Sequence, residues 1–488
     1  MKAATAMRAV RANRDDPRFL RRADGVESLN DLIFVVFLVT LAWLPLAFGS
    51  NRPIAWATNA ILFGSMLAVI ELGFLLGDRP RPVALRRLGW ALGVFAAVAG
   101  WIVVQTLPGL PLSWRSDFWQ IAADVLTSVP GAPPVHGSIS TTPDAGLVAL
   151  LRLATTAAAF YLAVQLCRDG LRARLFALGL VGIIAVYALY GIIQLIAFPE
   201  QLLWGPKFAY PGAVTSTFIN RNSFATYANV GLVVALALVF DSLQGDGVSR
   251  HLPFALRLSE LMARVVRQAL PLMVPLLVIA IALLWTLSRA GLLCGIFGVV
   301  TLIALYGVSG RRSVAHGIAG LLVALGFVAL VLAYGEGTVE RVDTADGLDT
   351  RLSVALQTLE AARDVPVTGF GYGSFADVYP VYRSDRFLNS FWTKAHDTYV
   401  ELAFELGFPA TLALLALGAG VLVVMMRNIA RRERRPLLSL AALAASVAAL
   451  THSLVDFSLQ IQAVGVTFWA LLGAGLTQSW SRRIDTSR

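Results

Sequence analysis

Charged residues and cysteines are scarce in this chain of 488 residues. Only 14% of the residues are charged, whereas 57% are hydrophobic, and the mean hydropathy is +0.70. A water-soluble domain of this size does not need so much apolar surface, so this composition excludes an ordinary soluble protein. The two cysteines, Cys167 and Cys294, lie far apart and outside any CxxC spacing. We therefore expect both to be packing residues without a metal or redox role.

Motifs for metals and nucleotides are also missing. No group of His, Cys, Asp and Glu residues has the spacing of a metal site, so we expect neither a metal nor another cofactor. The glycines at 369, 371 and 373 do not form a nucleotide fingerprint, because they neither follow a buried strand nor open a long helix. They are expected to let the backbone turn tightly near a site. The first 30 residues are polar and basic, which predicts no cleavable signal peptide.

Apolar runs of about 20 residues are what the chain has in abundance. They are continuous and do not alternate with polar residues, which predicts an all-α polytopic membrane protein and disfavours a β-barrel. About twelve transmembrane helices are expected, at 32–49, 53–76, 88–107, 145–166, 175–197, 222–240, 270–287, 290–307, 316–334, 398–426, 437–451 and 457–478.

The arginines indicate the orientation of these helices. They gather at both ends of the chain and in every second loop, and the loops in between contain few of them. Because cytoplasmic loops carry the excess of Lys and Arg, both termini are predicted to be cytoplasmic. The same pattern accounts for the net charge of +10 without a polyanion, so no nucleic-acid partner is expected.

One long polar segment, residues 335–397, interrupts the hydrophobic sequence, and we call it the island. The predicted divisions are a cytoplasmic tail at 1–31, helices 1–9 at 32–334, the island as a catalytic loop on the outer side, helices 10–12 at 398–478, and a cytoplasmic tail at 479–488. A long loop among short connections is usually functional. From Arg351 onward, Leu352, Leu356 and Leu359 share one face, which predicts a short amphipathic helix lying on the outer membrane surface.

Four arginines near the outer side are candidates for binding phosphate. Arg289 lies in a short turn, Arg351 begins the amphipathic helix, and Arg221 lies at the mouth of a span. Arg152 lies about two turns inside a span, where an ionisable group is costly and needs a partner or a cavity. Guanidinium groups bind phosphate oxygens in a fork, so arginines that converge would hold a diphosphate. Snorkelling to lipid, helix capping or local ion pairs are the structural alternatives.

Histidines supply the candidate base. His396 ends the island, and a neutral imidazole is able to take a proton from a hydroxyl group. A hydrogen-bonded interface residue is the structural alternative for it. His452 and Asp456 lie one helical turn apart at another outer turn, where they would either orient His396 or pair with each other.

At these residues the chain resembles the O-antigen ligase and polymerase superfamily of bacterial inner-membrane glycosyltransferases. The resemblance covers roughly residues 215–420. It rests on FINRNSFA at 218–225, LSRAGL at 287–292, Arg351, GFGYGSF at 369–375, HDTYVEL at 396–402 and ELGFP at 405–409. His396 and Gly407 keep the spacing of the family. Asp397 replaces its usual Asn, Ser or Gln, and Ala410 stands where a glycine is expected.

The resemblance implies a metal-independent, inverting enzyme of the GT-C type with its active site facing the periplasm. Such enzymes move a glycan from undecaprenyl diphosphate to a sugar hydroxyl in surface polysaccharide biosynthesis. By position, Arg289 and Arg351 would hold the diphosphate and His396 would be the general base, while Arg221 and Arg152 are further candidates for substrate binding. The expected supporting residues are Asp397, Tyr399, Gly371, Gly373, His452 and Asp456.

The acceptor distinguishes the possible activities. A ligase would use lipid A–core, whereas an O-antigen or exopolysaccharide polymerase would use another lipid-linked repeat unit. Twelve spans with both ends inside also suit a polysaccharide transporter or flippase, but transporters concentrate polar segments near the bilayer midplane. A non-catalytic assembly subunit is a third alternative. Membrane lipids and other polysaccharide export or assembly proteins are further expected partners.

Overall fold

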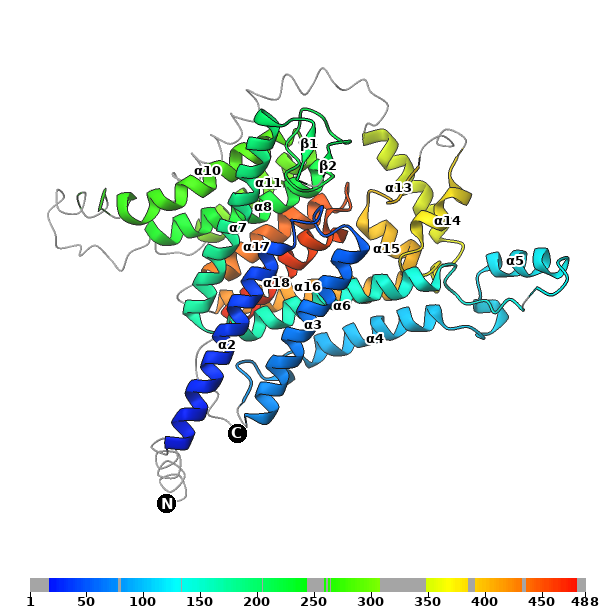
Figure 1. Ribbon diagram of the computed structural model, residues 1–488, viewed down its shortest axis with the longest axis horizontal. Helices are drawn as coiled ribbons and strands as arrows, with labels where there is room; N and C mark the ends of the chain where they lie inside the picture. Colours follow the sequence, from blue (N-terminus) through cyan, green and yellow to red (C-terminus); the bar gives the residue numbers. More distant parts are fainter. Residues whose placement is uncertain are drawn as a thin grey trace.

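The computed structural model describes residues 17–77, 80–132, 134–203, 205–243, 259, 262–263, 265–307, 348–384, 391–431 and 436–480. Nearly all regular structure in this part is helical, as Figure 1 shows. The first half contains α2 (Pro17–Trp43), α3 (Pro53–Leu76), η1 (Leu85–Arg87), α4 (Gly89–Thr106), η2 (Leu112–Trp114), α5 (Asp117–Thr127), α6 (Pro143–Leu166), α7 (Gly170–Ala197) and α8 (Arg221–Leu243). A two-stranded hairpin, β1 (Gln201–Leu202) and β2 (Gly205–Pro206), lies between α7 and α8.

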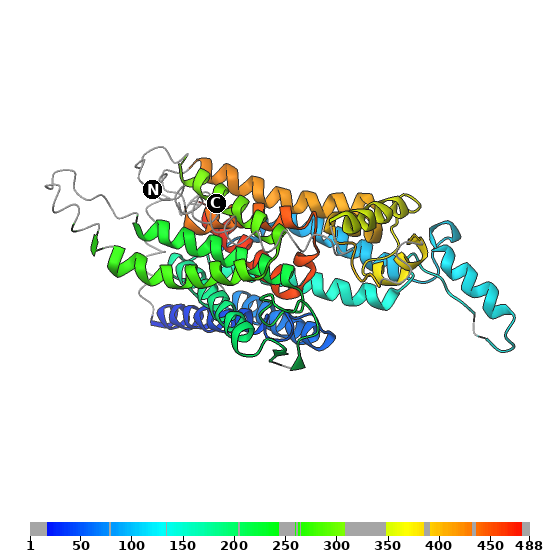
Figure 2. The same cartoon turned by 90° about the horizontal axis from the view of Figure 1, so that it is seen from above.

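The second half continues the helical pattern. Its elements are η3 (Val265–Ala269), α10 (Leu270–Trp285), α11 (Arg289–Gly307), α13 (Leu348–Ala362), α14 (Phe375–Tyr382), α15 (Thr398–Leu406), α16 (Phe408–Ala430), α17 (Leu437–His452), η6 (Ser458–Gln460) and α18 (Gln462–Ser479). Figure 2 shows α13 and α14 at one end of the long axis, away from the start of α2, with α5 extending further outward.

Eight helices in the described part of the chain are long and apolar enough to cross a membrane. The protein is therefore a helical membrane protein with several candidate spans. All eight correspond to predicted segments, and α17 and part of α2 are shorter apolar helices. The predicted span at 457–478 corresponds to η6 and α18, which are not among the eight, and the predicted span at 316–334 lies outside the described residues. The expected count of twelve therefore stays a prediction.

The central helix of the bundle is α8, whose apolar 18-residue segment is completely buried. A helix that is hydrophobic all round is buried on all sides, and α8 is packed by α7, α10, α11 and α17. Peripheral helices instead expose large apolar side chains, such as Ile54 at 78% and Val186 at 66%. In lipid these side chains lie in a favourable solvent, so their exposure agrees with a membrane-embedded bundle.

The predicted span at 398–426 is in fact two helices. The helix is interrupted at Gly407, whose φ of 78° and ψ of 161° lie in a region that only glycine adopts readily. The nine residues of α15 pack against α13 of the island, and α16 alone has the length of a span. This break brings the end of α15 close to the glycine-rich segment, since the Gly371 amide donates to the Glu405 carbonyl oxygen at 3.0 Å.

The segment predicted as an amphipathic helix is α13, which begins at Leu348, three residues before the expected start. Val354 and Ala361 face the protein and are buried. Leu352 and Leu356 are each 56% exposed, so an apolar stripe of α13 faces outward. Contact of this stripe with the membrane surface stays a prediction.

Candidate functional site

His396 occupies a strained position directly before α15. Its φ of 58° is in the left-handed region, which is uncommon for a residue other than glycine. The imidazole lies between the rings of Trp392 and Phe457, with centroid distances of 5.3 and 5.0 Å. Its side chain is 15% exposed. The ring is therefore held firmly while one part of it stays accessible.

Asp456 is the acidic partner of His396. Its carboxylate oxygen Oδ1 lies 3.8 Å from His396 Nδ1, which is an ion-pair distance when the imidazole is protonated. Asp456 is fully buried and accepts hydrogen bonds from Asn222 Nδ2 at 3.1 Å and from the Ser458 hydroxyl. Burial alone raises the pKa of Asp456, but His396, His452 and Ser458 outweigh it, and the net pKa lies below the usual value. The carboxylate therefore stays ionised and available to orient the imidazole.

Polar side chains connect this carboxylate, which follows the end of α17, with the starts of α8 and α11. Ser288 donates through Oγ to Asn222 Oδ1 at 2.8 Å, and Asn222 in turn donates to Asp456. Asn222 lies in the first turn of α8, and Ser288 directly precedes α11. Arg221 and Arg289 directly adjoin these two residues in the sequence, so their backbones lie near the cluster. The Arg221 guanidinium lies 5.1 Å from the Tyr210 ring centre.

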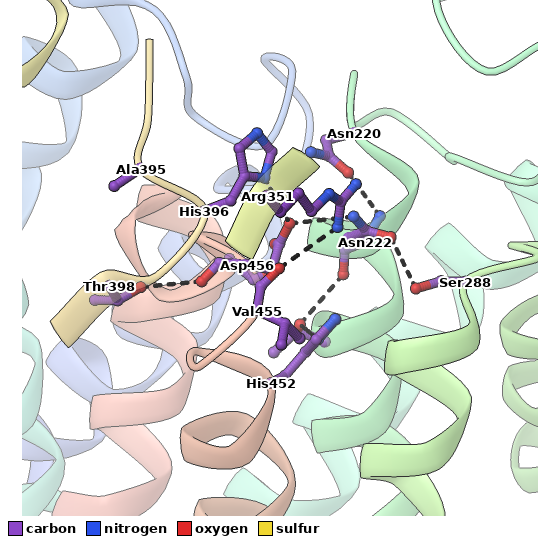
Figure 3. Close-up of polar contacts among 12 residues, drawn as sticks. Asn220, Asn222, Ser288, Arg351, Ala395, His396, Thr398, His452, Val455 and Asp456 are labelled. Atoms are coloured by element: carbon purple, nitrogen blue, oxygen red, sulfur yellow. Dashed lines mark hydrogen bonds and ion pairs between the residues drawn. The ribbon is translucent and has the colours of Figure 1, made fainter. Parts of the chain in front are cut away.

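Arg351 reaches this region from α13. Figure 3 shows its side chain and the His396 ring on the same side of Asp456. Its Nη1 lies 3.5 Å from the Val455 carbonyl oxygen, which is at the outer limit of a hydrogen bond. The structure therefore gathers a histidine, a carboxylate and a guanidinium from three segments that are distant in sequence.

His452, the second predicted histidine, lies at the buried side of this region. It lies at the end of α17 and is fully buried (Figure 3). Its Nδ1 is 2.6 Å from the Thr226 hydroxyl. Asp456 therefore provides the ion-pair partner of His396, and His452 supports the buried end of the same cluster.

Two other predicted site residues, Arg152 and Tyr399, contact other parts of the chain. Arg152 donates through Nη2 to the Gln460 carbonyl oxygen, and its guanidinium carbon lies 4.4 Å from the Trp56 ring centre. The Tyr399 hydroxyl donates to the Leu450 carbonyl oxygen at 2.7 Å. Both side chains line a cavity of about 770 Å³ whose lining does not include His396.

Gly371, Gly373 and Asp397 shape the backbone around the site. The two glycines have φ values of 106° and 88°, and a Cβ atom at Gly371 would lie only 2.2 Å from the Ser140 hydroxyl oxygen. Asp397 is the N-cap of α15, and its Oδ1 accepts from the amides of Tyr399 at 2.9 Å and Val400 at 3.1 Å. Asparagine and serine are equally good N-caps, so aspartate is a physically conservative replacement for them here.

Two carboxylates of α15 were missed as site residues in the sequence. Glu401 is 1% exposed and accepts from Lys394 Nζ at 2.7 Å and from the Ala395 amide at 2.8 Å. Glu405 accepts from the Phe375 amide at 3.1 Å, and burial together with Glu401 raises its pKa above the usual range. The sequence feature that could have indicated them is the spacing of these two acids, one helical turn apart in an otherwise largely apolar helix.

Comparison with known proteins agrees with the motifs. Residues 274–415, less than a third of the chain, match the family model described as O-antigen ligase. No curated protein matches the chain. The matched part contains Arg289, Arg351 and His396 and ends within α16. Over these residues the chain is thus similar to the O-antigen ligase family, which confirms its resemblance to the O-antigen ligase and polymerase superfamily.

Proposed function

We propose that this protein is a multi-pass inner-membrane glycosyltransferase of the O-antigen ligase type. It transfers a glycan from undecaprenyl diphosphate to a sugar hydroxyl on the periplasmic side, with both termini in the cytoplasm. The observation that carries this proposal is the pairing of His396 with the buried carboxylate of Asp456, beside Arg351. His396 and Arg351 both lie within residues 274–415, the segment similar to the family.

In the proposed reaction, His396 takes the proton of the acceptor hydroxyl through Nε2. The acceptor oxygen then bonds to the anomeric carbon of the glycan as the bond from this carbon to the diphosphate oxygen breaks, with inversion. Asp456 stabilises the imidazolium that forms, which an ionised carboxylate beside Nδ1 does well. Arg351, with Arg289 and Arg221 nearby, stabilises the charge that grows on the departing diphosphate.

The decisive experiment compares His396→Ala and Arg351→Ala with matched controls in the native host. Removing a general base slows such reactions by about 10²–10⁴-fold. We therefore expect both variants to lose surface polysaccharide and to accumulate lipid-linked glycan at normal protein levels. His136→Ala and Arg363→Ala are the controls, because both residues are exposed and lie outside the cluster. Normal polysaccharide in both site variants would contradict the proposal.

The accumulated lipid separates the two activities within this class. A ligase defect leaves long lipid-linked chains, because polymerisation continues without transfer to the final acceptor. A polymerase defect leaves single repeat units on the carrier. The chain length of the lipid-linked glycan in His396→Ala cells, measured by mass spectrometry, therefore assigns the acceptor.

A further inference from the structure

An aromatic side chain close to the base has no part in the reaction proposed above. Phe391 lies five residues before His396 and is 79% exposed. Among residues 391–396, all of which the structure describes, it is the only exposed apolar side chain, and Thr393, the other exposed residue there, is polar. An exposed aromatic ring on a segment that leads into a reaction centre is well placed to contact a substrate.

The segment that follows Phe391 is firmly held. Trp392 packs against the hydrophobic cluster of α13, α14 and α15, and Ala395 is a fully buried member of that cluster. Lys394 Nζ lies 2.7 Å from the Glu401 carboxylate, which ties the segment to α15. Because this backbone is already ordered, a ligand that binds to the Phe391 ring has little loop-ordering entropy to overcome.

The direction of the segment separates it from the side where the diphosphate is proposed to lie. Figure 3 shows Ala395 on one side of His396, and Asn220 with the Arg351 guanidinium on the other. In a displacement with inversion, the attacking hydroxyl and the departing group lie on opposite faces of the sugar ring. With the diphosphate at Arg351, the acceptor therefore enters from the side of residues 391–395. Five residues span at most about 17 Å, a distance that a short oligosaccharide bridges.

We propose that Phe391 stacks against a sugar ring of the acceptor, a subsite that rests on the proposed function. The C–H face of a pyranose is apolar and slightly positive, so it is attracted to the negative face of an aromatic ring, while the hydroxyl groups at its rim stay in water. Trp392, with its ring centre 5.3 Å from that of His396, forms the wall between this subsite and the base. The acceptor is thus a glycan of at least two sugars, one on Phe391 and one that presents its hydroxyl to His396.

The test measures acceptor binding and glycan transfer with the purified full-length chain. The probe is oligosaccharide released by mild acid from the surface polysaccharide of the native host, and its affinity is measured by saturation-transfer NMR. Phe391→Ala should weaken binding about tenfold and raise the acceptor KM about tenfold, with kcat and the donor KM unchanged. Phe391→Trp should bind at least as tightly as the wild type. Phe391→Leu keeps an apolar side chain without a π face and should lose most of the affinity that Phe391→Ala loses.

Phe198→Ala is the matched control, because Phe198 is 59% exposed at the C-terminal end of α7. An unchanged acceptor KM in Phe391→Ala would overturn the proposal, and so would a rise in the donor KM alone. Wild-type binding by Phe391→Leu would also overturn it, since any apolar side chain would then suffice. Sugar binding that depends on Phe391 in a chain without transfer activity would remove the proposed function and keep the sugar site, whereas transfer that does not depend on Phe391 would do the reverse.

Discussion

At the scale of single residues, the left-handed backbone of His396 is the feature that needs an explanation. A conformation of this kind costs about 1–2 kcal/mol in a residue with a Cβ atom, so its surroundings must hold it. Glu401 holds the preceding amide of Ala395, and the Thr398 amide donates to the Ser453 carbonyl oxygen at 2.9 Å. Strain held from both sides is typical of functional sites and here directs the imidazole toward Asp456.

Glu401 gives the first prediction at this scale. Glu401→Gln removes the charge that pairs with Lys394. The amide NH₂ of the glutamine would also face either Lys394 Nζ or the Ala395 amide, both of which are donors. We expect the rate of glycan transfer to fall about tenfold or more with little change in KM, because His396 is displaced and substrate contacts are kept. Steady-state assays with lipid-linked donor measure this.

Glu360→Gln is the matched control, since Glu360 is exposed on α13. An equal loss of rate in both variants, or a loss explained by unfolding in a thermal melt, would contradict a positioning role for Glu401.

The second prediction at this scale concerns Asp397. If this residue acts as an N-cap, Asp397→Asn should retain activity and stability, whereas Asp397→Ala should lose about 1 kcal/mol of stability. Asp169 is a comparable N-cap at the start of α7, where its Oδ1 accepts from Leu171 and Arg172. Asp169→Ala should therefore cost similar stability in thermal melts without reducing glycan transfer. Inactivity of Asp397→Asn would assign the carboxylate a chemical role instead.

At the scale of elements, the sequence predicts some features of the helices and not others. Continuous apolar runs predict where the candidate spans lie. A segment in lipid must hydrogen-bond all its backbone N–H and C=O groups internally, so a long apolar run forms a helix there. The break at Gly407 was not predicted, since one glycine inside an apolar run carries no hydropathy signal. The sequence left two alternatives for Asp456, orienting His396 or pairing with His452, because 60 residues and three helices separate Asp456 from His396 and only packing joins them.

Gly407 supports a prediction about the joint between α15 and α16. A Cβ atom there would lie 2.2 Å from the Val367 carbonyl oxygen, in a conformation that only glycine adopts readily. Gly407→Ala should destabilise the protein by about 2–3 kcal/mol or more and lower its melting temperature in detergent. Gly100→Ala is the control, because a Cβ atom at this position in α4 meets nothing within 4 Å. Similar melting temperatures for the two variants would argue against a strained joint.

At the scale of the whole molecule, two arginines from the predicted cytoplasmic loops lie at the C-terminal end of α18. Arg168 donates to the carbonyl oxygens of Thr477 and Trp480 at the end of α18, each at 2.9 Å, and Arg87 lies 5.5 Å from the Trp480 ring centre. Cations at the C-terminal end of a helix satisfy its free carbonyl groups and its dipole. The same arginines thus pack the bundle and supply the charge that predicts a cytoplasmic side.

The predicted orientation is testable because both native cysteines, Cys167 and Cys294, are buried and should react slowly. A cysteine placed at exposed Val381 on α14 should react in intact cells with a maleimide that does not cross the inner membrane. A cysteine at exposed Ala84, beside the arginines of η1, should react only after the membrane is permeabilised. Labelling is expected to differ about tenfold or more between the two sites, since the impermeant reagent reaches only one side. Reaction of Ala84→Cys but not Val381→Cys in intact cells would place His396 on the cytoplasmic side, where a periplasmic acceptor is out of reach.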